Sequence, residues 1–313
     1  MRGGEPWVRG FLPTLDEHMF DEPDSDSPAW LTGLNDRQRD AVLYGDGPLL
    51  VIAGAGSGKT RALASRVARL VDEGVPAERI LLLTFTRRAA AEMLRRSGAL
   101  ISDRSVGNVW GGTFHAVANR LLRQYGAAVG LQDGFTVIDQ ADAAALFGML
   151  RTELGYSGSK QRFPKKETIA AVYARTVNAR TPLTETVEDR FPWVVDHVDA
   201  LRELFRAYRA RKKEHNVVDY DDLLLYWNAL LDSSTGDSVR KLFDHVLVDE
   251  YQDTNRSQAE ILRSLCGSGG NLTVVGDDAQ AIYSFRGATV ENILEFPDLY
   301  EDASVVKLEQ NYR

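Results

Sequence analysis

The segment AGAGSGKT (53–60) carries the residue types of a phosphate-binding loop. Glycines let backbone N–H groups approach phosphate oxygens closely, and a helix that begins after the loop adds its positive end. Lys59 would bring a full charge to the β- and γ-phosphates, and Thr60 would offer its hydroxyl to Mg²⁺. The first position of this pattern is commonly glycine, but here it is Ala53. An ordinary glycine-rich turn is the disfavoured alternative, because an apolar run precedes the loop and a helical pattern follows it.

A pair of carboxylates ends a second apolar run, in VLVDEYQDTN (246–255). Asp249 is expected to hold Mg²⁺ through water, and Glu250 to orient and polarise an attacking water as general base. Adjacent carboxylates repel each other, so the pair fits best beside a cation. The alternative is a helix cap, in which Asp253 or Thr254 caps the helix that follows. Both interpretations can hold for different residues.

These groups require a scaffold of strands and helices that brings the loop and the carboxylates together. Short apolar runs without polar alternation predict buried strands, and helical patterns separate them. The fold class is therefore α/β, a parallel sheet with helices on both faces. The runs are LLVIA (49–53), ILLLTF (80–85), NVWGGTF (108–114), HVLVDE (245–250), NLTVVGD (271–277) and SVVKLE (304–309).

The pattern along the chain changes twice. Residues 1–30 are rich in acidic residues, proline and serine, and are predicted to be a disordered tail, with a docking segment as the weaker alternative. Residues 116–230 show helical patterns and no clear strand, which predicts an all-helical insertion. The ATP-binding core would then be discontinuous, formed by residues 31–115 and 231–313.

Composition excludes several classes of protein. The 313 residues are 44% hydrophobic and contain one cysteine, so neither an intrachain disulfide nor a cysteine zinc site is expected. No apolar run reaches the length of about 18 residues that spans a membrane, and no signal peptide is recognisable, so the predicted location is cytoplasmic. The net charge of −8 argues weakly against nucleic-acid binding. The basic segment 201–215 is either a solvated helix face or, with Lys160, Lys165 and Lys166, a surface for duplex DNA.

Seven motifs in order resemble the UvrD/Rep/PcrA-like superfamily 1 DNA helicases, from about residue 34 to Arg313. They are AGAGSGKT, TFTRRAAAEM, GTFHA, DYDDLL, VDEYQDTN, VVGDDAQAIYSFRGA and LEQNYR. The resemblance implies two RecA-like motor cores, each with an inserted helical domain, and ATP in the cleft between them. It covers the first core and its insertion only. The chain stops at QNYR, so it is expected to be truncated before the second core.

The resemblance also implies roles for single residues. Gln38 would read the adenine edge, and Arg61 and Tyr312 would sandwich the adenine ring. Gln280 would sense the γ-phosphate, and Arg313 would stabilise charge on it in the transition state. The loop residues implied to bind the nucleotide are Ala53, Gly54, Ala55, Gly56, Ser57, Gly58, Lys59 and Thr60.

The same resemblance places a track for single-stranded DNA on this core. Aromatic faces stack unpaired bases of any identity, at about 1–3 kcal/mol each. Core packing is the alternative for Phe85. Three departures from the family pattern are Arg87–Arg88 for Asn–Lys, which keeps positive charge, Phe285 for Trp and Ala281 for Ser. The implied DNA-binding residues are Phe85, Thr86, Arg88, His115, Tyr283, Phe285 and Arg286.

The resulting functional prediction is an ATP-dependent 3′→5′ DNA helicase that uses ATP and Mg²⁺. Its expected partners are single-stranded DNA, single-strand/duplex junctions and the second RecA-like core, with no membrane. The first alternative is a nucleotide- and single-strand-binding module without autonomous helicase activity. The second is the motor part of a helicase–nuclease recombination complex. A small-molecule kinase would share the phosphate loop but would leave GDDAQAIYSFRG and QNYR without a role.

Overall fold

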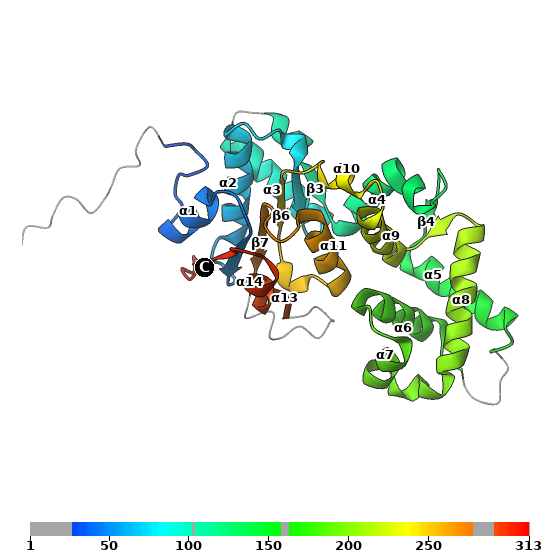
Figure 1. The fold of residues 1–313 in the computed structure, drawn as a ribbon. Coiled ribbons are helices and arrows are strands. Elements are labelled where there is room, and N and C mark those ends of the chain that lie inside the picture. Colours follow the sequence, from blue (N-terminus) through cyan, green and yellow to red (C-terminus); the bar gives the residue numbers. More distant parts are fainter. Residues whose placement is uncertain (1–26, 102–103, 158–162, 278–290, 313) are drawn as a thin grey trace, which may run out of the picture.

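The central element is a six-stranded sheet in which every neighbouring pair of strands is parallel (Figure 1). The computed structural model describes residues 27–101, 104–157, 163–277 and 291–312. The strand order is β3-β2-β6-β7-β1-β8. The strands are β1 (Leu49–Ala53), β2 (Ile80–Leu83), β3 (Trp110–Gly112), β6 (His245–Val248), β7 (Leu272–Gly276) and β8 (Ser304–Leu308).

All six strands lie within the apolar runs that predict them, and the α/β fold class is confirmed. Successive side chains of a strand point to opposite faces. In β2, Leu81 and Leu83 therefore join one hydrophobic cluster, while Ile80 and Leu82 join another. Because both faces are buried, the run reads as continuously apolar.

Helices cover both faces of the sheet. The cluster on one face includes residues of α1 (Asp36–Leu43), α2 (Lys59–Asp72) and α3 (Arg87–Leu100). The cluster on the other face includes residues of α4 (Phe114–Tyr125), α9 (Tyr220–Asp232) and α11 (Arg256–Cys266). The described part of the core also contains the short helices α10 (Gly236–Arg240), α13 (Glu291–Leu294) and α14 (Phe296–Leu299).

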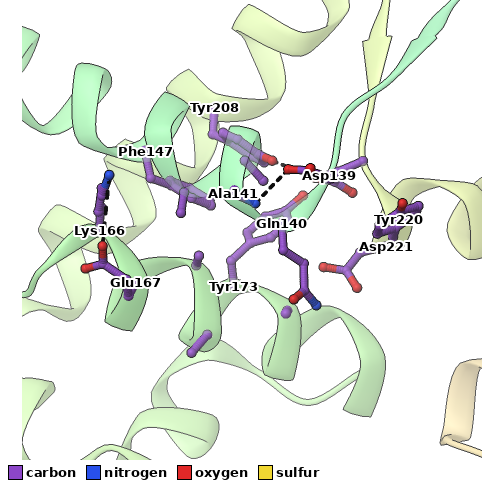
Figure 2. Close-up of a pocket in the computed structure, with 16 residues that line it drawn as sticks. Asp139, Gln140, Ala141, Phe147, Lys166, Glu167, Tyr173, Tyr208, Tyr220 and Asp221 are labelled. Atoms are coloured by element: carbon purple, nitrogen blue, oxygen red, sulfur yellow. Dashed lines mark hydrogen bonds and ion pairs between the residues drawn. The ribbon is translucent and has the colours of Figure 1, made fainter.

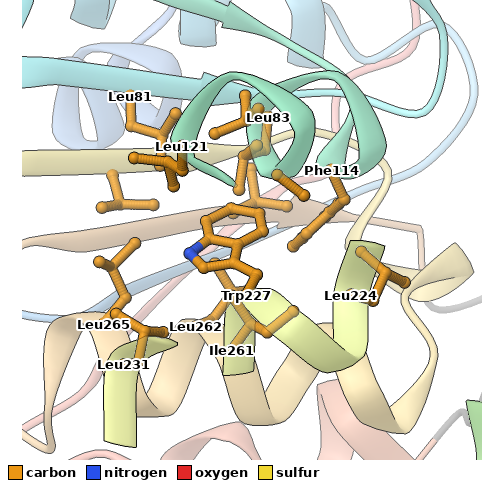
Figure 3. Close-up of a cluster of buried hydrophobic side chains, with 14 of the residues drawn as sticks. Leu81, Leu83, Phe114, Leu121, Leu224, Trp227, Leu231, Ile261, Leu262 and Leu265 are labelled. Carbon is orange, nitrogen blue, oxygen red and sulfur yellow. The ribbon is translucent and has the colours of Figure 1, made fainter. Parts of the chain in front are cut away.

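Trp227 of α9 is fully buried against the sheet. Its ring lies between Leu83 and Leu121 on one side and the helix α11 with Leu262 on the other (Figure 3). Both α4 and α9 overlap the predicted insertion 116–230, yet both pack on the sheet. Their amphipathic patterns show that they are helices but do not identify the surface that they cover.

A third cluster lies apart from the sheet, at the end of the molecule away from α1 (Figure 1). Its centre is aromatic, with Phe147 stacked on Tyr208 at 3.9 Å between ring centroids. We propose that the helical insertion is this part alone. Its helices are α5 (Gln140–Glu153), α6 (Lys166–Ala179), α7 (Leu183–Arg190) and α8 (Val198–Glu214).

Two details differ from the sequence-based expectations. The range expected to be entirely helical contains two paired strands, β4 (Thr136–Val137) and β5 (Val217–Val218). Two residues are too few to show a strand periodicity. The tail expected over residues 1–30 ends earlier, because Trp30 is 6% exposed and donates from Nε1 to Asp72. Among the described residues, no helix is both long and apolar enough to span a membrane.

Candidate active site

The phosphate-binding loop connects β1 to α2, as its sequence predicts. Gly58 precedes the helix with φ +83°, a left-handed conformation that favours glycine. A Cβ atom there would also lie 2.4 Å from Gln38 Nε2. Ser57 closes the loop internally, donating from Oγ to the carbonyl of Gly54 at 2.8 Å. The loop is therefore fixed by its own hydrogen bonds and by α1.

The carboxylate pair formed by Asp249 and Glu250 lies opposite this loop, at the carboxyl end of β6. Lys59 Nζ donates to Glu250 Oε2 at 2.8 Å, and Gln252 Nε2 donates to the same oxygen at 2.6 Å. Glu250 has φ 53° and ψ 46°, a left-handed conformation that costs a non-glycine residue roughly 1–3 kcal/mol. Strain of this kind gathers at functional sites, where the surrounding contacts hold it.

Asp249 has the arrangement expected of a cation ligand. Its side chain is buried, and Oδ1 has no hydrogen-bond partner within the described part of the chain. Burial, and then the neighbouring charge of Glu250, raises the pKa of Asp249 to about 6, against the opposing effect of Lys59. An unpaired buried carboxylate oxygen beside a phosphate loop suits a bound cation.

Magnesium is the cation that the sequence predicts at this site. The described residues contain no group of three His, Cys, Asp or Glu side chains placed to hold a metal. Magnesium is commonly bound by one or two protein oxygens and completes its shell with water and substrate phosphates. Thr60 and Asp249 stay the predicted ligands.

The residues implied to bind adenine gather around α1. Asn35 caps this helix, and its Nδ2 donates to the Tyr312 hydroxyl at 2.7 Å. The backbone N–H of Tyr312 donates to the carbonyl of Gly56 in the phosphate loop at 3.0 Å. The segment after β8 therefore lies against both the loop and α1, near the end of the chain marked C in Figure 1. Tyr312 is 56% exposed, and its stacking on adenine stays a prediction.

Gln38 and Arg61 make contacts within the chain. Gln38 is buried, accepts from the Asn35 N–H through Oε1 and donates from Nε2 to the carbonyl of Ser57. Arg61 donates from Nη2 to the carbonyl of Thr32 at 2.8 Å. In this structure Gln38 supports the phosphate loop directly, and its adenine contact stays a prediction, as does the stacking of Arg61.

A cavity of about 130 Å³ lies where β2, β3 and β6 end. Phe85, His115, Asp249 and Glu250 are among its lining residues. Phe85 is 62% exposed, which excludes core packing as the reason for this aromatic residue. Burial lowers the pKa of His115, so its imidazole is neutral at pH 7. The two carboxylates thus share one cavity with an exposed aromatic face.

Thr86 and Arg88, two of the residues predicted to bind DNA, differ in their contacts within the chain. Thr86 Oγ1 accepts from the Ala89 N–H and caps α3, so its side chain already has a structural role. Arg88 is exposed in the first turn of that helix, and its contact with a DNA phosphate stays a prediction.

Comparison with known proteins identifies the family to which the chain belongs. The family model for the UvrD/REP helicase N-terminal domain matches residues 34–301. The chain belongs to the UvrD/REP helicase family. It is 36% identical over 308 residues to the ATP-dependent DNA helicase UvrD1 of Mycobacterium leprae, covering 93% of this chain and 39% of that protein. It is 40% identical over 286 residues to the ATP-dependent DNA helicase PcrA of Leuconostoc citreum, covering 90% and 37%. PcrA of Bacillus subtilis is 37% identical over 289 residues, covering 90% and 38%.

This UvrD/REP family chain thus spans about two fifths of the length of the relatives that it matches. Five predicted site residues lie outside its described residues: Gln280, Tyr283, Phe285, Arg286 and Arg313. Their assignments stay predictions.

Two residues of the site were not identified from the sequence. Gln252 holds Glu250 through Nε2 and accepts from the Asp277 N–H through Oε1 at 3.0 Å. Asn255, rather than Asp253 or Thr254, caps α11, and forms a capping box with Gln258. The N-x-x-Q spacing is a signal that could have identified this cap.

The basic segment 201–215 is not a uniformly solvated face. Lys212 is 3% exposed, and its Nζ donates to Asp219 and Asp222, both at 2.6 Å. Lys212 therefore cannot meet duplex DNA. Lys160 lies outside the described residues, while Lys165 and Lys166 are exposed. Duplex binding by the exposed residues of this region stays a prediction.

Proposed function

We propose that this chain is the ATP-binding part of an ATP-dependent DNA helicase that moves 3′→5′ on single-stranded DNA and unwinds duplexes. The observation that carries the proposal is the ion pair of 2.8 Å between Lys59 and Glu250, next to the buried carboxylate of Asp249. A phosphate-loop lysine, a candidate base and a candidate cation ligand thereby meet at one edge of the sheet. The direction of movement rests on the family resemblance alone.

The chain's own groups divide the work of hydrolysis. Lys59 would exchange its bond with Glu250 for oxygens of the β- and γ-phosphates. Glu250, still held by Gln252, would then be free to accept a proton from the attacking water. Thr60 and Asp249 would hold Mg²⁺, which when bound supplies positive charge to the phosphates.

The DNA track would begin at the exposed ring of Phe85, on which an unpaired base can stack. Arg88 would contact the phosphate backbone. Because Phe85 lines the same cavity as Asp249 and Glu250, a stacked base would lie close to the hydrolytic groups.

One alternative is supported by an observation. The chain spans 37–39% of the two relatives described first, so a second motor core would complete the ATP site. By itself the chain would then bind nucleotide and single strands but neither hydrolyse ATP rapidly nor unwind DNA.

The test is nucleotide binding by residues 1–313, followed with a fluorescent ATP analogue and Mg²⁺. We expect Lys59→Ala to weaken binding at least tenfold, with the thermal melting temperature close to that of the unsubstituted chain. Lys241→Ala, at an exposed lysine away from the site, is the matched control and should bind normally. Equal affinity in the Lys59 variant would contradict the proposal.

ATP hydrolysis, measured with and without single-stranded DNA, separates the two forms of the proposal. Negligible turnover with intact nucleotide binding supports a site that a second core completes. Strong DNA-stimulated turnover would show that this chain, alone or as a dimer, has a complete site.

A further inference from the structure

Asn178, near the end of α6, joins the insertion to two helices of the core. Its Nδ2 donates to Asp221 Oδ1 at 2.8 Å, in the first turn of α9. Its Oδ1 accepts from Asn255 Nδ2, and its backbone carbonyl accepts from Ser257 Oγ, both at 3.4 Å. The last two bonds are long, but both reach the start of α11. One side chain and its carbonyl thus connect three helices.

Arg180 makes the second connection and has an unusual backbone. It ends α6 with φ 52° and ψ 35°, a left-handed conformation that glycine commonly supplies at this position. For a residue with a Cβ atom the conformation costs roughly 1–2 kcal/mol. Its side chain gives a reason for arginine here, because Nε lies 2.7 Å from Glu260 Oε2 on α11.

The contacts of Asn178 and Arg180 lead to both the proposed hydrolytic site and the proposed DNA track. The helix α11 begins directly after the loop that carries Asp249 and Glu250. The first turn of α9 carries Tyr220, whose ring lies edge-on to His115 at 5.6 Å between centroids. His115 lines the cavity that also contains Phe85 and the two carboxylates.

Asp221 also borders a cavity. A cavity of about 520 Å³ lies there, lined by alanines of α5 and α6 and by Tyr220 and Asp221 (Figure 2). The carboxylate of Asp221 therefore has the bond from Asn178 on one side and this cavity on another. Tyr220 lies next to Asp221 in the first turn of the same helix.

We propose that Asn178 and Arg180 are positioning residues that make nucleotide binding and single-stranded DNA binding depend on each other. A shift of the loop at Glu250 moves the start of α11, and Asn178 and Arg180 carry the shift to α9 and the insertion. The inference rests on the proposed function, since it requires that both ligands bind. Coupling between two binding sites is reciprocal, so either ligand reports it.

The test is a set of four dissociation constants, measured on residues 1–313. They are those of a non-hydrolysable ATP analogue with Mg²⁺ and of an oligothymidylate, each with and without the other ligand. We expect each ligand to change the affinity of the other by at least about fivefold. Asn178→Ala should reduce this factor to less than about twofold, while the affinity for each ligand alone stays within about threefold of the unsubstituted chain.

Thr176→Ala is the matched control, because among the described residues the bond of Thr176 Oγ1 is to the carbonyl of Val172 on its own helix. It should keep the full coupling. Arg180→Ala and Glu260→Ala should each reduce coupling. The double variant should be no worse than Glu260→Ala, which removes the Arg180 contact together with those to Arg256 and Asn228. Arg180→Lys, which keeps the charge, should restore part of the coupling.

Unchanged coupling in both Asn178→Ala and Arg180→Ala would overturn the inference, as would ligands that bind independently to the unsubstituted chain. If circular dichroism shows that Asn178→Ala does not fold, Glu260→Gln decides the question, since it keeps the shape of Glu260 and removes its charge. If the proposed function itself is wrong, the result is different: the Lys59→Ala variant then binds nucleotide as well as the unsubstituted chain.

Discussion

The single residue that most constrains the site is Asp249, a buried carboxylate whose Oδ1 lacks a partner in the described structure. Its folded pKa of about 6 lies above the ordinary value of 3.8, with burial as the main cause. The folded state therefore binds this proton more tightly than the unfolded state does. The free energy of unfolding should fall as pH rises from about 4 to 6, and the loss should persist above pH 6.

We expect Asp249→Asn to raise the melting temperature at pH 7.5, because the amide carries no charge to bury. The free energy of unfolding should rise by about 1–3 kcal/mol. The advantage should disappear by pH 4, where the aspartate is protonated. Thermal melts at both pH values test this, with Asp298→Asn, at an exposed carboxylate, as the control. An advantage of equal size at both pH values would show that ionisation is not its cause.

Arg88 and His115 should differ in how they bind single-stranded DNA. Each phosphate contact by a cation contributes about 0.7 to the slope of log affinity against log salt. Arg88→Ala should therefore reduce the slope by about 0.7. His115→Asn should leave it unchanged, because burial lowers the pKa of His115 and keeps the imidazole neutral. Titrations over a range of salt concentrations measure both, and a reduced slope in the His115 variant would contradict a neutral side chain.

At the scale of the element, α2 does more than place the phosphate loop. Arg66 is 2% exposed, and its Nη1 and Nη2 donate to the carbonyls of Ala41 and Gly45, both at 3.1 Å, where α1 ends. Its Nε donates to Thr273 Oγ1 on β7 at 3.0 Å. Burial, and then the charge of Arg69, lowers the pKa of Arg66 to about 10, so it stays charged at neutral pH. Arg66 thereby fixes α1, and with it Gln38, to the sheet.

Arg66→Met should lower the free energy of unfolding by about 2–4 kcal/mol, because it removes the buried hydrogen bonds to the Ala41 carbonyl and the Thr273 hydroxyl. Arg66→Lys keeps the charge and part of the hydrogen bonding, and should cost less. Urea denaturation measures both. A methionine variant as stable as the unsubstituted chain would mean that those groups find other partners.

Elements were predictable from the sequence to different degrees. The strands were predictable because a strand buried on both faces reads as an uninterrupted apolar run, as in LLVIA and ILLLTF. The partner of a helix was not, since α4 and α9 have ordinary amphipathic patterns but pack on the sheet. In the site, Lys59 and Glu250 carry recognisable types and spacing, whereas Gln252 acts through a hydrogen bond that only the folded loop creates.

At the scale of the whole molecule, three hydrophobic clusters divide the described chain. Two of them share the strands of one sheet, so they should unfold together. The third, formed by α5 to α8, has its own aromatic centre and meets the core through polar contacts such as the Arg180–Glu260 ion pair. Such a unit can open locally at a lower free energy than the core.

Phe147→Ala tests this division. Phe147 is 1% exposed and contacts Tyr173, Phe205 and Tyr208, so its removal should cost the third cluster about 3–5 kcal/mol. Hydrogen–deuterium exchange should then quicken in α5 to α8 while the amides of β1, β6 and β7 keep their protection. Trp227→Ala, with a similar loss of buried ring in the sheet cluster, is the control and should expose the strands. Exchange that quickened in the strands as strongly as in α5 to α8 would show that loss of packing in the third cluster also destabilises the sheet. The insertion and the core would then be one cooperative unit.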